Sequence, residues 1–264
     1  MLFIVSPAKK TVDASDAFAW RDAPRFLPQA CELLDALRAM PYAELKSLWA
    51  CSDALAELNY ARVQRMDPRD ERLLAPAVFS YEGIQYQNLT PQVMTDAQLD
   101  YLQSHLRILS GFYGVLRPFD GVVPYRLEMQ AKLAMPAGAN GGPTRNLYEF
   151  WGPRLFDELC SDMDECGEQI IVNLASVEYA KAVEPYAKGA AKAGGPRYIT
   201  CLFGSMKNGK FVQRSTEAKA ARGTFVRWCA EHAIEHVADF SRFNVGGYSL
   251  NEELSTEHKF VFVH

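Results

Sequence analysis

The sequence has no long apolar run and no excess of positive charge. None of its hydrophobic stretches approaches the roughly 20 residues of a membrane-spanning helix, so we expect no membrane partner. Lysine and arginine number 28 against 32 aspartates and glutamates, a formal net charge of −4 at pH 7. Any nucleic-acid site must therefore be a local basic patch. The start, MLFIVSPAKK, places apolar residues before its lysines, the reverse of a signal peptide, and we expect a cytoplasmic protein.

Cysteine is scattered, with no C-x-x-C spacing, so a redox motif has no support. In a chain of 264 residues we interpret the cysteines as reduced, mostly buried thiols of a cytoplasmic protein. The six are Cys31, Cys51, Cys160, Cys166, Cys201 and Cys229.

The usual signatures of nucleotide binding and of serine hydrolases are also missing: G-x-x-x-x-G-K-[ST], G-x-G-x-x-G and G-x-S-x-G do not occur. We expect no cofactor. One metal pattern is present, because His232-x-x-Glu235-His236 fits the H-x-x-E-H spacing of a zinc peptidase family, and Cys229 would share its helical face. No distal acidic ligand can be identified, so we interpret the segment as an ordinary amphipathic helix and expect no metal site. Direct iron binding likewise has few ligands in the sequence.

The composition is that of one soluble domain with a sizeable core, at 48% hydrophobic and 23% charged residues. Periodicity and punctuation predict both helices and strands. The expected helices are three between Phe26 and Arg65, one from a Thr95–Gln98 capping box through Leu106, one over Leu147–Cys160 broken near Gly152, and one from Ser215. The expected strands are Leu2–Val5, a run from Pro76 continuing through Tyr81–Leu89, Ile170–Leu174, Tyr198–Phe203 paired with Phe211–Arg214 through Asn208-Gly209, and Phe260–Val263. The acidic run Asp157–Glu168 predicts a solvated surface turn.

The stretch Leu106–Met129 holds the most unusual local pattern. Two apolar runs flank a small-residue turn with Ser110, Gly111 and Gly114, where the backbone must turn tightly or let something approach closely. The polar segment that follows carries Arg126 and Glu128. Core packing and contact with an anion are both consistent with this pattern.

Polar residues follow two of the predicted strands. Lys9 and Lys10 come after Leu2–Val5, where ligands often lie in α/β proteins, although an exposed basic loop explains them equally. Asn173 and Ser176 follow Ile170–Leu174, where outward N–H groups suit an anion and where ordinary helix capping is the alternative.

A second basic feature is the segment Lys207–Arg227, with six basic residues and one acidic residue. It is the best candidate for an anion-facing surface, and a solvated helix face would look the same. The pairs Ser176/Lys181 and Ser215/Lys219 fit a serine–lysine nucleophile, but capping and solvation explain both.

Several motifs recur in a fixed order: SPAKK, YEGIQYQNL, LRILSGFYGVLRPFDGVVPYRLEM, NLYEFWG, IVNLASVEYAKAVE, STEAKAARG and EHKFVFVH. This set closely resembles the YaaA family of bacterial peroxide stress proteins, nearly end to end. Two motifs depart from the family's pattern: AKKARG is Ala218-Lys219-Ala220-Ala221-Arg222-Gly223 here, and Lys10 is an added lysine in SPAKKTVD.

The resemblance implies one α+β domain over residues 1–264, a mixed sheet with helices, a positively charged cleft and a helix-hairpin-helix-like element. It also implies a cytoplasmic protein that binds duplex or branched DNA with little sequence specificity and helps limit free iron during hydrogen peroxide stress. We place the hairpin on a helix–turn–helix around Ser110–Gly114, although its glycines are three apart where the usual hairpin spaces them two apart. The expected DNA contacts are Lys9, Lys10, Ser110, Gly111, Gly114, Arg117, Arg126, Lys219 and Arg222.

A different class of function stays open: an enzyme acting on a small anionic or nucleotide-like substrate in the same cleft. Glu128 motivates it, since a buried carboxylate is a poor partner for DNA and a better acid, base or orienting group. The candidate catalytic residues are Glu128, Ser176, Lys181 and Ser215. A deep pocket holding Glu128 beside Arg126 would favour an enzyme, and structural pairing of the two would count against it.

Overall fold

The first strand, β1 (Leu2–Val5), is buried along its whole length and lies inside the main sheet. It runs parallel to β5 on one side and to β8 on the other. The computed structural model describes residues 1–14, 18–163 and 169–264. Within them the main sheet has the order β11-β12-β9-β8-β1-β5-β6, with β10 paired to β9. Its further strands are β5 (Leu106–Ser110), β6 (Gly114–Leu116), β8 (Ile170–Asn173), β9 (Arg197–Lys207), β10 (Lys210–Val212), β11 (Ser249–Leu250) and β12 (Lys259–Val263).

The central strands β5, β1, β8, β9 and β12 are parallel, so their carboxyl ends lie at one edge of the sheet. The outer pairs β5–β6, β9–β10 and β11–β12 are antiparallel. Two small ribbons lie outside this sheet, β2 (Lys10–Thr11) with β4 (Tyr81–Glu82) and β3 (Ala75–Pro76) with β7 (Gly121–Val122). The result is an α+β domain with a mixed sheet, as expected.

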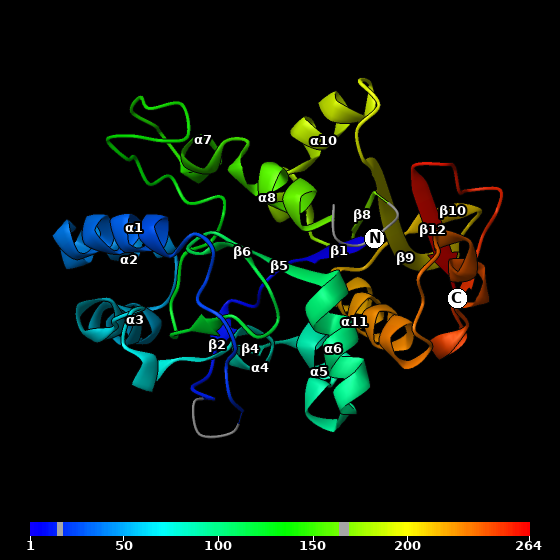
Figure 1. Cartoon of the computed structure of the whole chain (residues 1–264), viewed down its shortest axis with the longest axis horizontal. Helices are drawn as coiled ribbons and strands as arrows, with labels where there is room; N and C mark the ends of the chain where they lie inside the picture. The colour runs from blue at the N-terminus through cyan, green and yellow to red at the C-terminus, as the bar shows by residue number, and fades with distance from the viewer. Residues whose placement is uncertain (15–17, 164–168) are drawn as a thin grey trace.

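Helices cover both faces of the sheet (Figure 1). α5, α6 and α11 lie below it in that view, α8 and α10 lie above, and α1–α3 form a separate group beyond the β5–β6 side. The helices are α1 (Leu27–Ala39), α2 (Tyr42–Trp49), α3 (Asp53–Arg65), α4 (Ala77–Ser80), α5 (Ile84–Leu89), α6 (Asp96–His105), α7 (Leu147–Trp151), α8 (Arg154–Met163), α9 (Val177–Ala180), α10 (Glu184–Ala191) and α11 (Ser215–Glu231). Short 3₁₀ turns are η1 (Glu71–Leu73), η2 (Pro91–Val93), η3 (Val237–Arg242) and η4 (Val245–Gly247).

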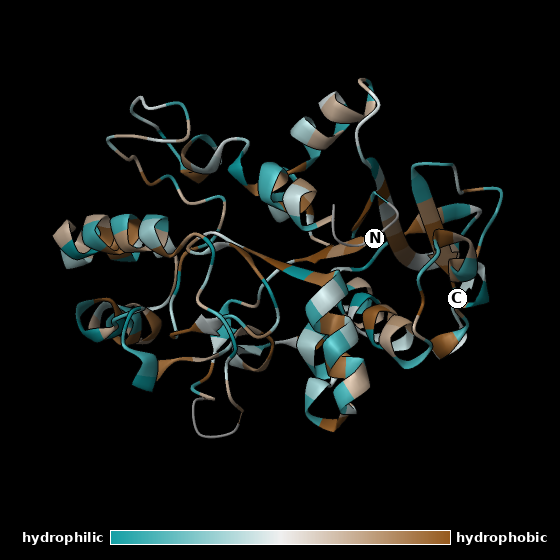
Figure 2. Cartoon of the chain, in the orientation of Figure 1, coloured by the Kyte–Doolittle hydropathy of each residue, from teal (hydrophilic) through white to brown (hydrophobic). Residues whose placement is uncertain are grey.

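The hydrophobic colouring concentrates on the central strands, whereas the helices mix hydrophilic and hydrophobic residues (Figure 2). On one face of the sheet Phe225 of α11 packs edge-on against Phe3 of β1 and against Phe240 and Phe243. These fully buried rings fix α11 to the sheet, because large aromatic side chains contribute much of the apolar area buried in a core.

Most of the predicted elements are present. The Thr95 hydroxyl accepts from the Gln98 amide and the Gln98 side chain accepts from the Thr95 amide, which is the capping box that starts α6. Asn208 and Gly209 both have positive φ and connect the antiparallel strands β9 and β10, as the Asn-Gly signal indicates.

Three predictions that concern β5–β6, α4–α5 and α8 were wrong. The chain around Ser110–Gly114 is the turn of the β-hairpin β5–β6 and contains no helix–turn–helix. The predicted strand from Pro76 through Leu89 is mostly helical, as α4 and α5, with two-residue strands between. The acidic run Asp157–Glu168 begins inside α8 rather than in a surface turn, and Asp162 is only 5% exposed.

Residues 164–168 of that acidic run, with Cys166, lie outside the described residues. Of the other five cysteines, Cys31, Cys201 and Cys229 are buried and Cys51 and Cys160 are half-buried. Among the residues described, no helix is both long and apolar enough to cross a membrane.

Candidate functional site

The candidate site lies where the chain reverses its direction across the sheet. From β1 the chain proceeds to β5 on one side and later returns to β8 on the other side of β1. Neighbouring parallel strands whose connections leave in opposite directions open a crevice at their carboxyl ends, and ligands of open α/β sheets bind there. The β1–β8 pair forms this position here.

Hydrogen bonds tie together the two loops at this crevice. The Ser176 amide donates to Ser6 Oγ at 2.8 Å, and Ser6 Oγ donates to Ser176 Oγ at 3.2 Å. From α5, the Tyr86 hydroxyl donates to the Ser6 carbonyl at 3.0 Å. The loop after β1 is therefore held between β8 and α5.

These loops, together with α5 and α11, enclose a cavity of about 520 Å³. This size is within the range of pockets that hold small molecules. Its charged lining consists of Lys9, Lys10, Lys219, Arg222, Glu82 and Glu178. Four cations against two carboxylates make this a locally cationic pocket on a chain whose net charge is −4.

The four cations differ in how they are paired. Lys10 Nζ lies 2.6 Å from a Glu82 oxygen, and Lys9 Nζ lies 3.4 Å from Glu128. Lys219 and Arg222 have no ion pair within residues 1–14, 18–163 and 169–264. The pocket therefore contains two cations whose charge no described carboxylate balances.

Arg222 is the more unusual of the two, because it is 9% exposed and its Nε lacks a hydrogen-bond partner among the described residues. Burial lowers the pKa of its guanidinium. An isolated buried charge is costly unless it is paired and hydrogen-bonded. The buried guanidinium of Arg222, unpaired within the described parts of the chain, is therefore suited to binding an anionic ligand.

Glu178 supplies a carboxylate with altered acidity on the same pocket. Burial raises the pKa of Glu178. A hydrogen bond from the Gln130 amide and the charge of Lys9 lower the pKa, but burial has the larger effect. The Gln130 amide donates to Oε1 at 3.2 Å. A carboxylate with a raised pKa in a pocket is a candidate acid or base.

The turn after β8 does not supply the outward N–H groups that its sequence predicted. The Leu174 amide donates to the Ile4 carbonyl, the Ala175 amide to Asn173 Oδ1 and the Ser176 amide to Ser6 Oγ. Asn173 itself is buried and acts within the turn. The amides of this turn are therefore not free to bind an anion in the pocket.

Glu128 is paired structurally rather than placed as an acid or base. Arg126 donates to its Oε1 at 2.9 Å, and Lys9 approaches the same oxygen. Glu128 lines a neighbouring cavity of about 580 Å³ that shares Lys9 with the cationic pocket and does not include Arg126. This pairing counts against Glu128 as a catalytic group.

The hairpin residues are inaccessible. Ser110 is fully buried, and its Oγ accepts from the amides of Phe112 and Tyr113. Gly111 and Gly114 are buried in the same turn. Their amides cannot reach a phosphate on the surface.

Arg117, another expected DNA contact, donates to Asp162 at 2.6 Å and is mostly buried. Together with Arg107 it holds the carboxylate of Asp162 inside the protein. The guanidinium is therefore engaged in an internal ion pair.

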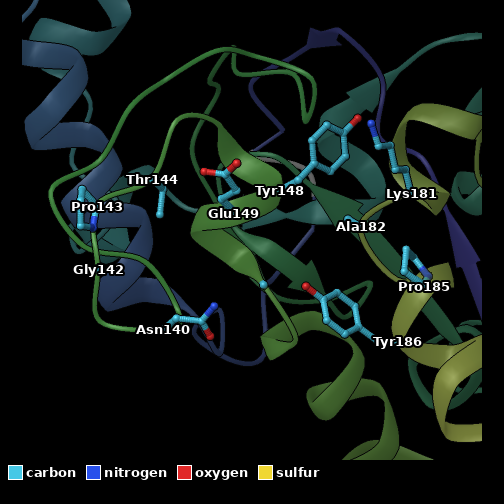
Figure 3. Close-up of a pocket in the computed structure, with 11 residues that line it drawn as sticks. Asn140, Gly142, Pro143, Thr144, Tyr148, Glu149, Lys181, Ala182, Pro185 and Tyr186 are labelled. Carbon is cyan, nitrogen blue, oxygen red and sulfur yellow. The ribbon is translucent and has the colours of Figure 1, made fainter.

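The two residues of one serine–lysine pair share a cavity, and those of the other pair do not. Ser215 and Lys219 both line the cationic pocket with Ser176, whereas Lys181 lines a separate cavity of about 490 Å³. There the Lys181 amine lies 4.8 Å from the centre of the Tyr148 ring. Figure 3 shows the two side chains next to each other. Ser176 and Lys181 thus face different cavities.

The segment with the H-x-x-E-H pattern is not a helix, because α11 ends at Glu231 and His232 is its cap. His232 Nδ1 lies 2.9 Å from the Trp228 carbonyl oxygen. In the part of the chain that the structure describes, no group of three or more His, Cys, Asp or Glu side chains is placed to hold a metal ion.

The polar lining residues that sequence reasoning missed are Ser6, Glu82, Gln85, Tyr86, Glu178 and Tyr179. Ser6 follows β1 directly, so the rule that placed Lys9 at a strand end applies to it as well. Glu178 lies five residues after the end of β8, so the same rule could have found it. Tyr86 carries no such signal, because α5 reaches the site only through tertiary packing.

Comparison with known proteins covers nearly the whole chain. A family model described as peroxide stress protein YaaA matches residues 1–254. A UPF0246 protein of Lactiplantibacillus plantarum is 45% identical over 264 residues, covering 100% of this chain and 99% of that protein. UPF0246 proteins of Limosilactobacillus reuteri and Lachnoclostridium phytofermentans are each 43% identical over 263 residues, covering 99% and 100% of this chain and 98% and 96% of those proteins.

Proposed function

Because the chain belongs to the family of the peroxide stress protein YaaA, we propose that it acts in the peroxide stress response by binding DNA through the phosphate backbone. Binding is largely independent of sequence, since phosphate contacts position a protein without reading bases. In this proposal the protein is cytoplasmic and helps to limit intracellular free iron.

The observation that supports DNA binding is the grouping of exposed lysines at one edge of the sheet. Lys9, Lys10 and Lys219 are exposed and line one pocket at the carboxyl ends of β1 and β8. The parallel strand β9 carries the exposed Lys207 and Lys210 of its hairpin beyond the same edge. This grouping, part of the proposed positively charged cleft, provides a local basic surface on an acidic chain.

The test is a gel-shift titration with duplex and branched DNA at several salt concentrations. Each lysine–phosphate contact contributes about 0.9 to the slope of log affinity against log salt. A triple variant of Lys9→Ala, Lys10→Ala and Lys219→Ala is therefore expected to lower that slope by about 3. The absence of salt-sensitive retention of the unaltered protein would refute DNA binding.

A matched control removes the same charge elsewhere. Lys46→Ala, Lys188→Ala and Lys192→Ala change a half-buried lysine of α2 and two exposed lysines at the end of α10. This variant is expected to keep the slope of the unaltered protein. Chelatable iron in peroxide-treated cells that lack the gene and are complemented with each variant tests the iron part separately.

A second function is favoured by the cationic pocket itself: an enzyme or binding protein for a small anionic or nucleotide-like molecule. The specific observation is Arg222, buried at the pocket without a carboxylate partner in the described parts of the chain. A duplex cannot bring its backbone to a guanidinium that is 9% exposed. In this function Glu178, rather than Glu128, is the candidate acid or base.

A further inference from the structure

We infer that the cationic pocket binds a phosphate monoester, with Lys219 and Arg222 of α11 holding the phosphate. The inference rests on the second proposed function and names its ligand class. Two sources share this chemistry, a free mononucleotide and the terminal phosphate of a DNA strand.

The charges of the pocket are only partly balanced within the described residues. Lys10 is paired with Glu82. Lys9 is paired with Glu128 and also attracts the carboxylate of Glu178 electrostatically. Lys219 and Arg222 remain without a carboxylate within the described residues. Their two positive charges match the two negative charges of a phosphate monoester near neutral pH.

The geometry of α11 places the two cations together. Lys219 and Arg222 are three residues apart on α11, a spacing that puts side chains on the same helix face. Both line the pocket, Lys219 exposed and Arg222 buried. A phosphate would thus meet a fixed guanidinium inside and a flexible amine outside, and a guanidinium suits bidentate contact with phosphate oxygens.

The beginning of α11 lies at the same pocket. Ser215, its first residue, lines the same pocket. The preceding cap residue is Arg214, and no described side chain accepts a hydrogen bond from the first turn. A helix start without a side-chain cap favours an anion through its N–H groups and its dipole. The hydroxyl of Ser215 adds a further donor.

An internal phosphate of intact DNA does not fit this pocket. A diester extends in two directions, and the pocket around Arg222 is bounded by the Ser6–Ser176 contact and by Tyr86 of α5. A terminal phosphate needs a single exit. The carboxylates Glu82 and Glu178 repel phosphate and so orient the organic part of the ligand away from α11.

The main experiment measures thermal shift and calorimetric binding of deoxyadenosine 5′-monophosphate, with deoxyadenosine as the matched ligand lacking phosphate. The nucleotide is expected to raise the Tm and the nucleoside to leave it unchanged, since a ligand that binds the native state stabilises it. A second arm compares one single strand with a 5′-phosphate and with a 5′-hydroxyl. A phosphate effect confined to the oligonucleotide identifies strand ends as the source, and an effect confined to the mononucleotide identifies a free ligand.

The decisive variant is Arg222→Met, which is similar in length and uncharged. It is expected to raise the Tm of the ligand-free protein, because it removes a buried charge without a partner, and to abolish the phosphate-dependent shift. An arginine with a purely structural role would lower the Tm on replacement. Arg227→Met is the control, since Arg227 lies on the same helix, pairs with Glu231 and does not line the pocket.

Lys219→Gln provides a second variant at an exposed position, where folding is not at risk. A charged hydrogen bond contributes enough that its loss weakens binding by about tenfold or more. Equal binding of nucleotide and nucleoside, or an undiminished phosphate effect in both variants, would overturn the inference. If the protein retains duplex DNA in a salt-sensitive manner but shows no preference for phosphate monoesters, the inference is overturned and the proposed DNA binding stands.

Discussion

Gly223 of α11 lies directly on the backbone of Gln85 in α5. A Cβ at this glycine would be 2.0 Å from the Gln85 carbonyl oxygen and 3.0 Å from the Leu89 amide nitrogen. Both neighbours are backbone atoms, so no side chain can move aside. The absence of a side chain at Gly223 therefore sets the distance between the two helices, and its neighbour Arg222 is thereby held at the pocket.

The first prediction concerns this contact. Gly223→Ala is expected to lower the free energy of unfolding by about 2 kcal/mol or more, because overpacking against backbone forces the two helices apart. Urea denaturation measures the effect. Gly189→Ala is the control, since Gly189 lies in α10 with nothing within 4 Å of its Cβ position. Alanine there is expected to stabilise by about 0.5–1 kcal/mol, and equal effects of both changes would contradict the interpretation.

The second prediction concerns Asp162, which binds two arginines inside the protein. Arg107 Nε lies 2.5 Å from one carboxylate oxygen and Arg117 lies 2.6 Å from the other. Asp162→Asn is expected to cost about 3–5 kcal/mol, because it leaves the guanidinium charges uncompensated. Chemical denaturation checks it against Asp157→Asn, an exposed change on the same helix, which is expected to stay within about 0.5 kcal/mol.

The third prediction concerns Asp120, which is 1% exposed. Burial raises its pKa from 3.8 to about 7, although the Arg117 amide donates to it and lowers the pKa in part. Between pH 4 and 7 the native state retains a proton that the unfolded state has lost, so stability falls as pH rises through this window and is level above it. This shift in the pKa of Asp120 corresponds to a decrease of about 4 kcal/mol in the free energy of unfolding.

Asp120→Asn tests this window, since its amide oxygen can still accept from Arg117. The difference in unfolding free energy between the unaltered protein and the variant is expected to change by a few kcal/mol between pH 4 and 7. Asp162 does not contribute to the change in stability between pH 4 and 7. Burial raises its pKa, but the charges and hydrogen bonds of Arg107 and Arg117 have the larger effect and lower it. Its stabilisation is lost only below about pH 4. A difference that is constant with pH would show that Asp120 is ionised throughout.

Short sequence patterns predicted the helices, turns and strands that depend on a few adjacent residues. The Thr95 capping box, the Asn208-Gly209 turn and the apolar run before Asn173 each depend on a few adjacent residues, and each element is present. The same holds for cations at strand ends, since Lys9 and Lys10 follow β1 and line the pocket. Their role in binding DNA stays a prediction.

Features that depend on distant partners were not visible in the sequence. β5 is buried on both faces and shows no period, so its apolar run is equally compatible with a helix. Asp162 is buried because of arginines 45 and 55 residues away. The basic run predicted Arg222 as a cation, but only the fold reveals that it has no carboxylate partner among the described residues.

The fourth prediction separates folding from DNA contact at the hairpin turn. Ser110 Oγ accepts from the amides of Phe112 and Tyr113 and lies 2.6 Å from the Tyr125 hydroxyl. Ser110→Ala is expected to destabilise the protein by about 1–3 kcal/mol, because buried donors lose their acceptor. The salt slope of DNA binding is expected to stay unchanged, since Ser110 is 0% exposed. A lower slope in gel shifts of the folded variant, checked by circular dichroism, would restore the turn as a phosphate contact.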